Sequence, residues 1–287
     1  MLPSGGMTAP PDVTIRPMAR EEMDLAVRWA AEEGWNPGVH DAEAFYDSDP
    51  TGFFVAEKDG QVAGTVSLVS YAGDLSFAGF LVVRPDLRGQ GIGAMLIRHM
   101  LECGKDRNTG GDGVPAMLST YLRKGFRFAY WNHRFKGLGG GEPEGGLSSL
   151  ADMPFEELVR YDSNIFPAPR ERFLRAFLSQ KDTTVLISQQ EGRIDAYGAI
   201  RRCLEGHKIG PLFADNRAAA EKVLRGLVST VPGEPYFIDV PEPNADGMAM
   251  ARDLGLTETF RTARIYTKQP PVAPLHRMFG NTSFELG

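Results

Sequence analysis

Cysteine is scarce in this chain of 287 residues, where only Cys103 and Cys203 occur. Two cysteines so far apart form neither a disulfide framework nor a zinc-binding spacing, so we expect a reducing compartment, the cytoplasm. No segment approaches the roughly 20 apolar residues that a membrane span requires, and we expect no membrane partner. Residues 1–12 lack lysine, arginine and an apolar core, which predicts a disordered leader rather than a signal peptide.

An excess of basic residues is also missing. Residues 1–146 contain 14 lysines and arginines against 19 acidic residues, and residues 147–287 contain 17 against 18. Neither half therefore has the basic surplus that a nucleic-acid-binding domain shows. The five histidines include no pair at metal-ligand spacing, so we expect no bound metal.

What is present is the composition of an ordinary globular protein, with 42% hydrophobic and 24% charged residues. The length favours two domains, and alternating strand and helix patterns predict the α/β class. In the first half we expect a short strand at 114–117 and, before it, a polar glycine loop at 108–113. The other patterns predict strands at 13–16, 52–57, 62–70, 75–83 and 126–135, and helices at 21–33, 42–46, 91–102 and 119–124.

A glycine-rich run separates two halves of the chain. Residues 137–146 contain six glycines, a composition that holds no packed element. We therefore predict a linker at 137–147, between a domain at 13–136 and a domain at 148–287.

The second half repeats the order of elements of the first. Gly60 lies 65 positions before Gly125, and Gly192 lies 63 positions before Gly255. In each half the first of these glycines follows a turn signal between two strands, and the second ends a helix. A shared order with nearly constant spacing indicates tandem homologous domains.

The most specific motif is the run Arg88-Gly89-Gln90-Gly91-Ile92-Gly93, which follows an apolar strand and opens an amphipathic helix. Glycines let backbone amides approach an oxyanion closely, and the helix N-terminus adds free N–H donors and partial positive charge. Together they predict a pyrophosphate site, with Arg88 placed to contact a phosphate bidentately. The alternative is a plain strand–turn–helix junction.

Two nucleotide-binding folds fit this run less well. Gly89, Gly91 and Ala94 match the dinucleotide pattern G-x-G-x-x-[GA], but Pro85 and its neighbours separate the strand from the first glycine. A hairpin also precedes the run, and the next strand with a terminal acid is missing. A Walker loop is excluded because no Gly-Lys-Ser/Thr follows.

The run resembles the R/Q-x-x-G-x-G/A signature of the GCN5-related N-acetyltransferases (GNATs), and residues 13–135 resemble that fold. The whole chain is similar to the tandem YitH-like subgroup, which has a catalytic first domain and a divergent GNAT-like second domain. The resemblance implies a mostly antiparallel mixed sheet flanked by helices in each domain, and acetyl-CoA as cosubstrate. It implies that the pyrophosphate is held by the loop and the pantetheine arm by the preceding strand, here Leu81, Val82, Val83, Arg88, Gly89, Gln90, Gly91, Ile92 and Gly93.

The same resemblance implies a catalytic residue. Tyr121 lies four residues before Gly125-Phe126, matching the position of the family's tyrosine, which protonates the departing thiolate. Without the resemblance, a packing role for Tyr121 would be the simpler interpretation. The strand at 75–83 contains no Glu or Asp, so no general base is visible. Asp74 and a chain of waters stay open as alternatives.

Candidate substrate residues come from both halves. Trp35 and Asn36 follow the first helix, in the loop that lines the acceptor site of similar enzymes, and would hold an amine or amino-acid head. Asp239, at a strand end of the second half, is a further candidate, although a strand-end cap is the simpler interpretation. The second half has Ala218-Ala219-Ala220 instead of a glycine loop and Ala251 instead of a tyrosine, so we expect it to form a wall of the acceptor pocket.

These observations predict an N-acetyltransferase that transfers acetyl from acetyl-CoA to a primary amine of a small molecule, in a ternary complex. Another acyl-CoA acyltransferase and a non-catalytic acyl-CoA sensor stay open, as do monomer and homodimer. We also expect residues 1–136 alone to bind acetyl-CoA.

Overall fold

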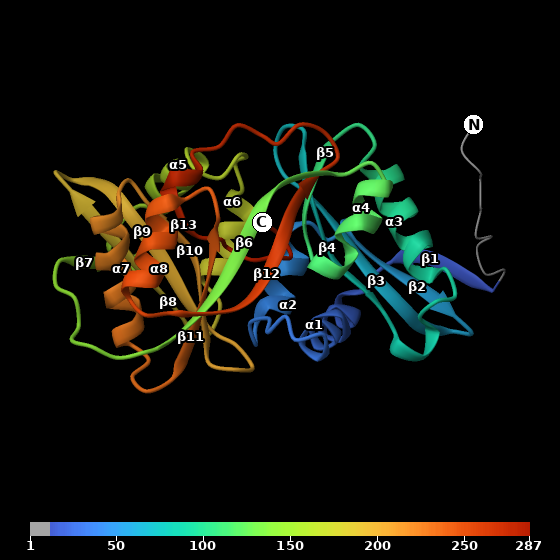
Figure 1. The fold of residues 1–287 in the computed structure, drawn as a ribbon, viewed down its shortest axis with the longest axis horizontal. Helices are drawn as coiled ribbons and strands as arrows, with labels where there is room; N and C mark the ends of the chain where they lie inside the picture. Colours follow the sequence, from blue (N-terminus) through green and yellow to red (C-terminus); the bar gives the residue numbers. More distant parts are fainter. Residues whose placement is uncertain (1–11) are drawn as a thin grey trace.

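The computed structural model describes residues 12–287, so the predicted leader lies outside the described residues apart from Asp12. The two halves of the chain lie side by side, with β6 and β12 running between them (Figure 1). In the first half the strands are β1 (Val13–Pro17), β2 (Phe53–Lys58), β3 (Gln61–Ser70), β4 (Leu75–Val83), β5 (Asn108–Gly113) and β6 (Arg127–Leu138). Its helices are α1 (Met23–Glu32), α2 (Asp41–Ser48), α3 (Ile92–Cys103) and α4 (Leu118–Arg123).

The second half repeats this order, as predicted. Its strands are β7 (Leu147–Ser149), β8 (Thr183–Gln190), β9 (Arg193–Arg202), β10 (His207–Ala214), β11 (Pro235–Pro241), β12 (Thr257–Tyr266) and β13 (Met278–Gly280). Its helices are α5 (Phe155–Ser163), α6 (Glu171–Leu178), α7 (Arg217–Ser229) and α8 (Ala245–Asp253). Within the described chain the strand pairs are antiparallel except β4–β5 and β10–β11, which confirms the mixed, mostly antiparallel class.

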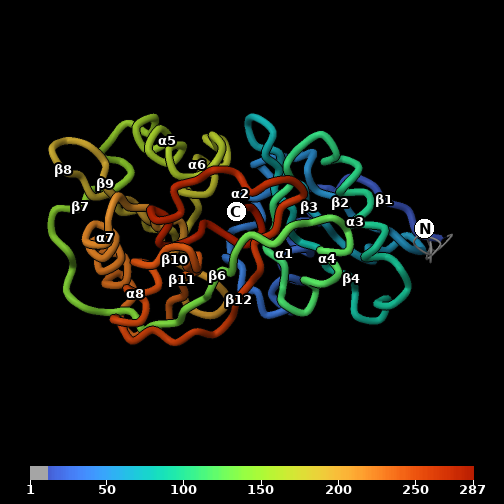
Figure 2. Tube along the Cα trace, turned by 45° about the horizontal axis from the view of Figure 1, so that its top comes forward, coloured from blue at the N-terminus to red at the C-terminus, as the bar shows by residue number. Residues whose placement is uncertain are grey.

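The two halves share one sheet rather than forming two. Its order is β1-β2-β3-β4-β5-β12-β6-β11-β10-β9-β8-β7, with β13 against β10. Strand β12 of the second half lies between β5 and β6, and β6 of the first half pairs with β11. Figure 2 shows β6 and β12 in the middle of the molecule from a second direction. The halves have thus exchanged strands β6 and β12, an exchange that the linear order of elements does not reveal.

The predicted linker at 137–147 overlaps the end of β6 and the start of β7. Its glycines are tied to the second half, because Gly139 donates a backbone hydrogen bond to Glu234 (2.8 Å) and Gly140 donates one to Val228 (2.8 Å). The segment therefore runs along the second half as a fixed connection.

The glycine-rich segment at 108–113 is a strand, not the predicted loop. Strand β5 pairs in parallel with β4 and antiparallel with β12, and a turn of 3-10 helix at Pro115–Met117 replaces the predicted strand at 114–117. Neighbouring aromatic rings leave no room for a side chain at Gly110 of this strand. A Cβ at Gly110 would lie 2.8 Å from the Tyr266 ring and 3.2 Å from the Phe77 ring. The glycines are needed for close packing in a central strand.

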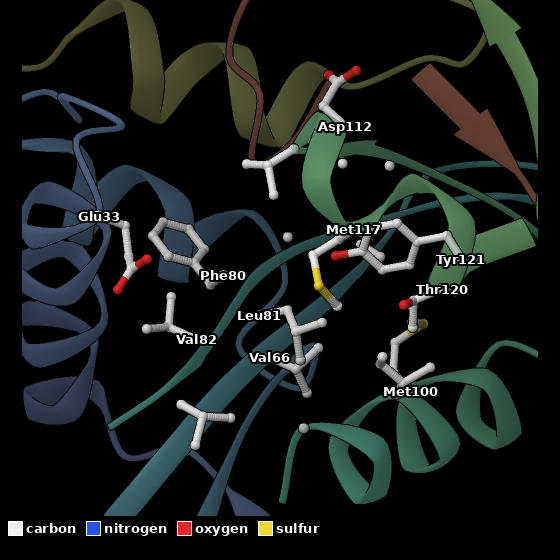
Figure 3. A pocket seen from close by; sticks show the side chains of 18 of the residues that line it. Glu33, Val66, Phe80, Leu81, Val82, Met100, Asp112, Met117, Thr120 and Tyr121 are labelled. Carbon is white, nitrogen blue, oxygen red and sulfur yellow. The ribbon is translucent and has the colours of Figure 1, made fainter. Parts of the chain in front are cut away.

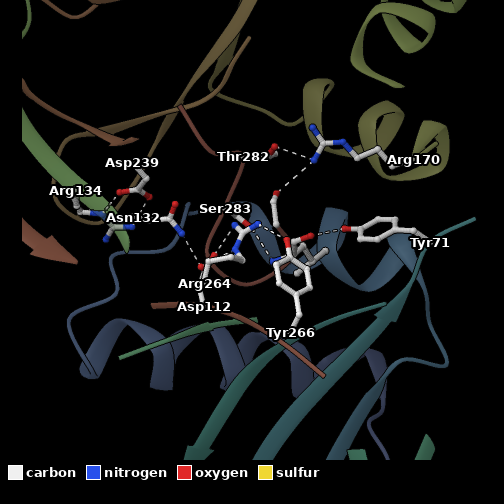
Figure 4. Close-up of polar contacts among 12 residues, drawn as sticks. Tyr71, Asp112, Asn132, Arg134, Arg170, Asp239, Arg264, Tyr266, Thr282 and Ser283 are labelled. Carbon is white, nitrogen blue, oxygen red and sulfur yellow. Dashed lines mark hydrogen bonds and ion pairs between the residues drawn. The ribbon is translucent and has the colours of Figure 1, made fainter. Parts of the chain in front are cut away.

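Buried arginine–aspartate pairs tie the halves together. Arg264 of β12 binds Asp112 of β5 with two hydrogen bonds of 2.9 and 2.8 Å, and Asn132 donates a third (2.7 Å; Figure 4). Arg134 of β6 binds Asp239 of β11 at 2.6 and 2.8 Å. A third pair joins α2 to β9, through Asp41 and Arg201.

No helix within residues 12–287 combines the length and the apolar character needed to cross a membrane.

Candidate functional site

A cavity of about 610 Å³ opens in the first half, between β4, the loop before α3, the end of β5 and α4. Side chains from the second half close one end of it, namely Phe260 and Thr262 of β12 together with Phe284 and Glu285. Figure 3 shows the cavity with β4 along its floor and Tyr121 at its rim.

Strand β4 breaks its regular pairing where it meets the cavity. Thr65 of β3 pairs with Val82 and Ser67 pairs with Gly79, so two residues of β4 stand opposite one residue of β3. Phe80 in this bulge has a φ of 49°, and its carbonyl accepts a hydrogen bond from the Thr65 hydroxyl (2.6 Å). Strand β5 pairs with β4 only over Leu75–Ala78, so the edge of β4 from the bulge onward has no strand partner there.

Leu81, Val82 and Val83, the three strand residues expected to hold a pantetheine arm, line the cavity from this open edge. Unpaired backbone amides and carbonyls seek partners. The edge can therefore bind an extended chain that carries amide groups, in the manner of an added strand.

The glycine run forms the turn between β4 and α3. Gly89 and Gly91 have φ values of 79° and 89°, in the region that side chains disfavour, and a Cβ on Gly89 would meet no atom within 4 Å. Gly91 is the N-cap of α3 and provides no side-chain cap, so the first amides of the helix are free to bind an anion. Gly89, Gly91, Ile92 and Gly93 line the cavity.

Two further loop residues have partners of their own. Arg88 lines the cavity, and its guanidinium donates to the Val83 carbonyl (3.0 Å) and to the Glu33 carboxylate at the end of α1. Gln90 lies outside the cavity lining, where its amide donates to the Asp86 carbonyl (3.4 Å) and accepts from Lys58 (3.3 Å). An incoming phosphate would compete with Glu33 for Arg88.

Tyr121 projects from α4 into the cavity, with its hydroxyl directed toward the interior beside Met117 (Figure 3). Its ring packs edge-on against Phe126, with centroids 5.9 Å apart. A Cβ on Gly113, the last residue of β5, would lie 2.6 Å from this ring, so glycine is required there for Tyr121 to take its place. Burial raises the pKa of the Tyr121 phenol, which keeps it protonated at neutral pH.

Of the two predicted acceptor residues on the loop after α1, the structure brings one to the cavity and not the other. Trp35 lines the cavity, and its carbonyl accepts hydrogen bonds from Arg134 (2.8 Å) and Lys208 (3.3 Å). Asn36 lies outside the lining and instead clamps its loop to the second half, exchanging two hydrogen bonds with the Glu205 backbone at 2.9 and 3.0 Å.

Asp239 is not brought to the cavity. It is 1% exposed, and Arg134 occupies both of its carboxylate oxygens. This placement corrects the expectation that Asp239 faces the acceptor across from Trp35. The sequence offered an acid at a strand end but no sign that an arginine on a neighbouring strand would neutralise it.

The carboxylate that the sequence analysis did not single out is Glu285. It borders the cavity, is 2% exposed, and neither carboxylate oxygen has a hydrogen-bond partner in the described part of the chain. Glu285 lies in the run 282–287, which follows β13. Across residues 12–287, no group of three or more His, Cys, Asp and Glu residues is placed to hold a metal ion.

Comparison with known proteins agrees with this geometry. A family model described as "Acetyltransferase (GNAT) family" matches residues 20–116, and one described as "Acetyltransferase (GNAT) domain" matches residues 158–280. A Pseudoalteromonas protein named holothin acyltransferase is 30% identical over 279 residues, which cover 96% of this chain and 94% of that protein. The chain belongs to the GNAT superfamily.

Solved structures support a tandem GNAT fold. A protein from Pyrococcus horikoshii superposes with a TM-score of 0.84 at 19% identity, covering 96% of both chains. A tandem GNAT protein from the clavulanic acid biosynthesis pathway gives a TM-score of 0.62 at 15% identity, covering 90% of this chain and 99% of its own. At these identities the likeness concerns the fold alone.

Proposed function

We propose that this tandem GNAT protein is an N-acetyltransferase that uses acetyl-CoA to acetylate a primary amine of a small molecule in a ternary complex. The observation that carries the proposal is a convergence on one cavity. The uncapped start of α3, the open edge of β4 and the Tyr121 hydroxyl all meet there. The relative named holothin acyltransferase supports acyl transfer as the reaction type.

The residues present fit an acyl-CoA donor. Gly89, Gly91, Ile92 and Gly93 would hold its pyrophosphate, with Arg88 released from Glu33. Leu81, Val82 and Val83 would hold the pantetheine amides on the open edge. When bound, the donor supplies a thioester. The acyl group is transferred from it, and the carbonyl carbon of that group is the atom attacked.

Tyr121 would protonate the departing sulfur. Its hydroxyl points into the cavity, and the raised pKa of its phenol keeps the proton available. A backbone amide of β4 near Val82 would stabilise negative charge on the acyl oxygen, since the bulge leaves that edge unpaired.

The cavity favours a short acyl chain. Val66, Leu81 and Met100 line it beside Tyr121 (Figure 3), so the carboxylate of a succinyl or malonyl group would lie against apolar side chains. We propose the cytoplasm as the site of action, supported by the free thiols of Cys103 and Cys203.

A thiol-release assay over a panel of primary amines tests this proposal. We expect turnover with acetyl-CoA to exceed turnover with succinyl-CoA or malonyl-CoA for the best amine. Tight coenzyme A binding without thiol release for any amine would instead support an acyl-CoA sensor. Faster transfer from a dicarboxylic donor would assign a different acyl chain.

A further inference from the structure

Glu285 is a buried carboxylate beside the acyl-transfer cavity, and it makes no side-chain hydrogen bond or ion pair with the described residues. It is 2% exposed, and both oxygens lack a hydrogen-bond partner among residues 12–287. Buried carboxylates are otherwise paired, as Asp41, Asp112 and Asp239 are here. An unpartnered carboxylate at the border of a binding cavity indicates a group that is completed by a ligand.

The backbone places Glu285 at the bulge of β4. Its carbonyl occupies the space that a Cβ would take at Gly79, the residue immediately before Phe80. The neighbouring Tyr71 hydroxyl donates to the Leu286 carbonyl (2.7 Å), which fixes the same segment against the first half. Figures 1 and 2 both show this end of the chain between the two halves. Glu285 therefore adjoins the point where the open edge of β4 begins.

The charges around Glu285 are balanced in pairs, with one exception. Behind Trp35, Arg134 is taken by Asp239 and Arg201 by Asp41. Lys208 is fully buried and contacts only the Trp35 carbonyl through its ammonium, at 3.3 Å. Lys208 and Glu285 are thus the cation and the carboxylate without an ion-pair partner in this described cluster.

These neighbours set the pKa of Glu285. Burial raises it, and Asp41 adds to the rise, whereas Lys208, Arg134 and Arg201 oppose it. Burial lowers the pKa of Lys208. The titratable and charged groups that act on this pair are Arg134 of β6, Arg201 of β9, Cys203 just after β9, Lys208 of β10, Asp239 of β11 and Asp41 of α2.

The walls on this side of the cavity are aromatic. Trp35, Phe80, Phe260 and Phe284 line it, and the Phe260 and Phe284 rings lie 6.2 Å apart. A single unsatisfied carboxylate among such walls suits a cationic amine carried on a compact apolar body.

Resting on the proposed function, we propose that Glu285 binds the acceptor as its ammonium form and takes the proton that must leave before the nitrogen attacks. The nitrogen then forms a bond to the acyl carbon, and the carbon–sulfur bond breaks. Tyr121 gives its proton to the sulfur, and the second proton lost by the nitrogen replaces it. The proton on Glu285 passes to solvent after product release, so one proton is released per turnover.

The test compares charged and neutral probes on wild type and Glu285→Gln. Benzylamine, phenethylamine and cyclohexylmethylamine are each paired with the corresponding alcohol, and binding is measured by calorimetry alongside coenzyme A. We expect wild type to favour amines over alcohols by roughly 10-fold or more. Glu285→Gln should lose this preference and keep its coenzyme A affinity. Glu102→Gln, at the exposed end of α3, also removes one negative charge. It should change neither the preference for amines over alcohols nor the coenzyme A affinity.

The pH profile separates proton transfer from a structural role. In wild type, kcat/KM for the amine should rise on an acid limb that lies above the ordinary pKa of glutamate. In Glu285→Gln only neutral amine reacts, so the loss, roughly 100-fold at neutral pH, should shrink as pH approaches the pKa of the amine itself. Lys208→Met, which keeps Glu285, should move the acid limb to higher pH.

A folded Glu285→Gln protein with the wild-type pH profile would overturn the proposal, as would a wild type that prefers no amine over its alcohol. If Glu285→Gln does not melt cooperatively, the pH profile of Lys208→Met provides the test instead. An acid limb of kcat/KM that stays at its wild-type pH in Lys208→Met would contradict the proposal. Failure of wild type to bind coenzyme A would instead refute the proposed function, while the amine–alcohol comparison still tests Glu285.

Discussion

The two helices that follow the central parallel strands begin in opposite ways. In the first half, Gly91 caps α3 with a positive φ and no side-chain hydrogen bond. In the second half, Asn216 caps α7, and its side chain accepts a hydrogen bond from the Ala219 amide (3.0 Å). One helix offers its first amides to a ligand, and the other satisfies them itself.

A second pair of positions shows the same divergence. Gly125 and Gly255 both end a helix with positive φ, 96° and 67°. The residue four positions earlier is Tyr121 in the cavity of the first half and Ala251, fully buried, in the second. The two halves share this scaffold, but of the two corresponding positions only the first half has the uncapped helix start and the tyrosine.

The second half still takes part in the site. Strand β12 and the segment with Phe284 and Glu285 close one end of the cavity, and the exchange of β6 and β12 fixes them there. In the proposed function, the first half would bind the donor and the second would form part of the acceptor wall.

Separating the halves should have the largest effect. Residues 1–136 alone leave β6 without β11 and β12, and leave Asp41, Asp112 and Arg134 without their partners. Each broken buried pair costs about 3–5 kcal/mol, against a typical total stability of about 5–15 kcal/mol. We now expect no cooperative melt from this fragment, which replaces the expectation that it binds acetyl-CoA. A cooperative melt with coenzyme A binding like that of the full chain would show that the exchange is dispensable.

Blocking the start of α3 should abolish donor binding. In Gly91→Val a β-branched residue meets a φ of 89° and occupies the approach to the free amides, so coenzyme A affinity should fall by roughly 100-fold or more. Gly192→Val, in the β8–β9 turn with a φ of 75°, imposes comparable strain away from the cavity. It should lose stability but bind coenzyme A normally. Equal affinity of Gly91→Val and wild type would exclude the loop as the phosphate site.

Removing the Tyr121 hydroxyl should slow turnover by roughly 100-fold with coenzyme A affinity unchanged. The pKa of Tyr121 is raised, so its proton is retained beyond the ordinary tyrosine value near 10. Wild-type kcat should therefore show no alkaline limb from this group below about pH 10. Tyr236→Phe on β11 is the matched control. If Tyr121→Phe turns over like wild type, Tyr121 only packs against Gly113.

Removing the α7 cap should have the smallest effect. Asn216→Ala leaves one amide of α7 unsatisfied and should cost about 1 kcal/mol of unfolding free energy. Coenzyme A stoichiometry and affinity should not change, because α7 binds no phosphate in this account. Denaturant unfolding and calorimetry measure the two quantities. A gain of a second coenzyme A site in this variant would mean that only the cap distinguishes the halves.

Local signals predicted much of this arrangement. The apolar run at 75–83 is β4, and the glycine run does turn into α3 at the cavity. The patterning failed where packing across the sheet decides structure. Glycines that read as a loop form β5, because Tyr266 and Phe77 fill the space beside them.

Long-range pairing lay beyond the sequence. Nothing local to residues 257–266 indicates that this strand inserts between β5 and β6. In the same way, no local pattern shows that β6 pairs with β11 and brings Arg134 to Asp239. Glu285 looked like one more acid in a short terminal run. Its burial beside Gly79 follows only from the way the halves meet.

Calorimetric titration of the full chain with coenzyme A tests the central claim most directly. We expect one site per chain, lost in Gly91→Val and kept in Asn216→Ala, because of the two corresponding helices α3 and α7 only α3 begins without a side-chain cap. Two equivalent sites per chain, or one site that survives Gly91→Val, would contradict it.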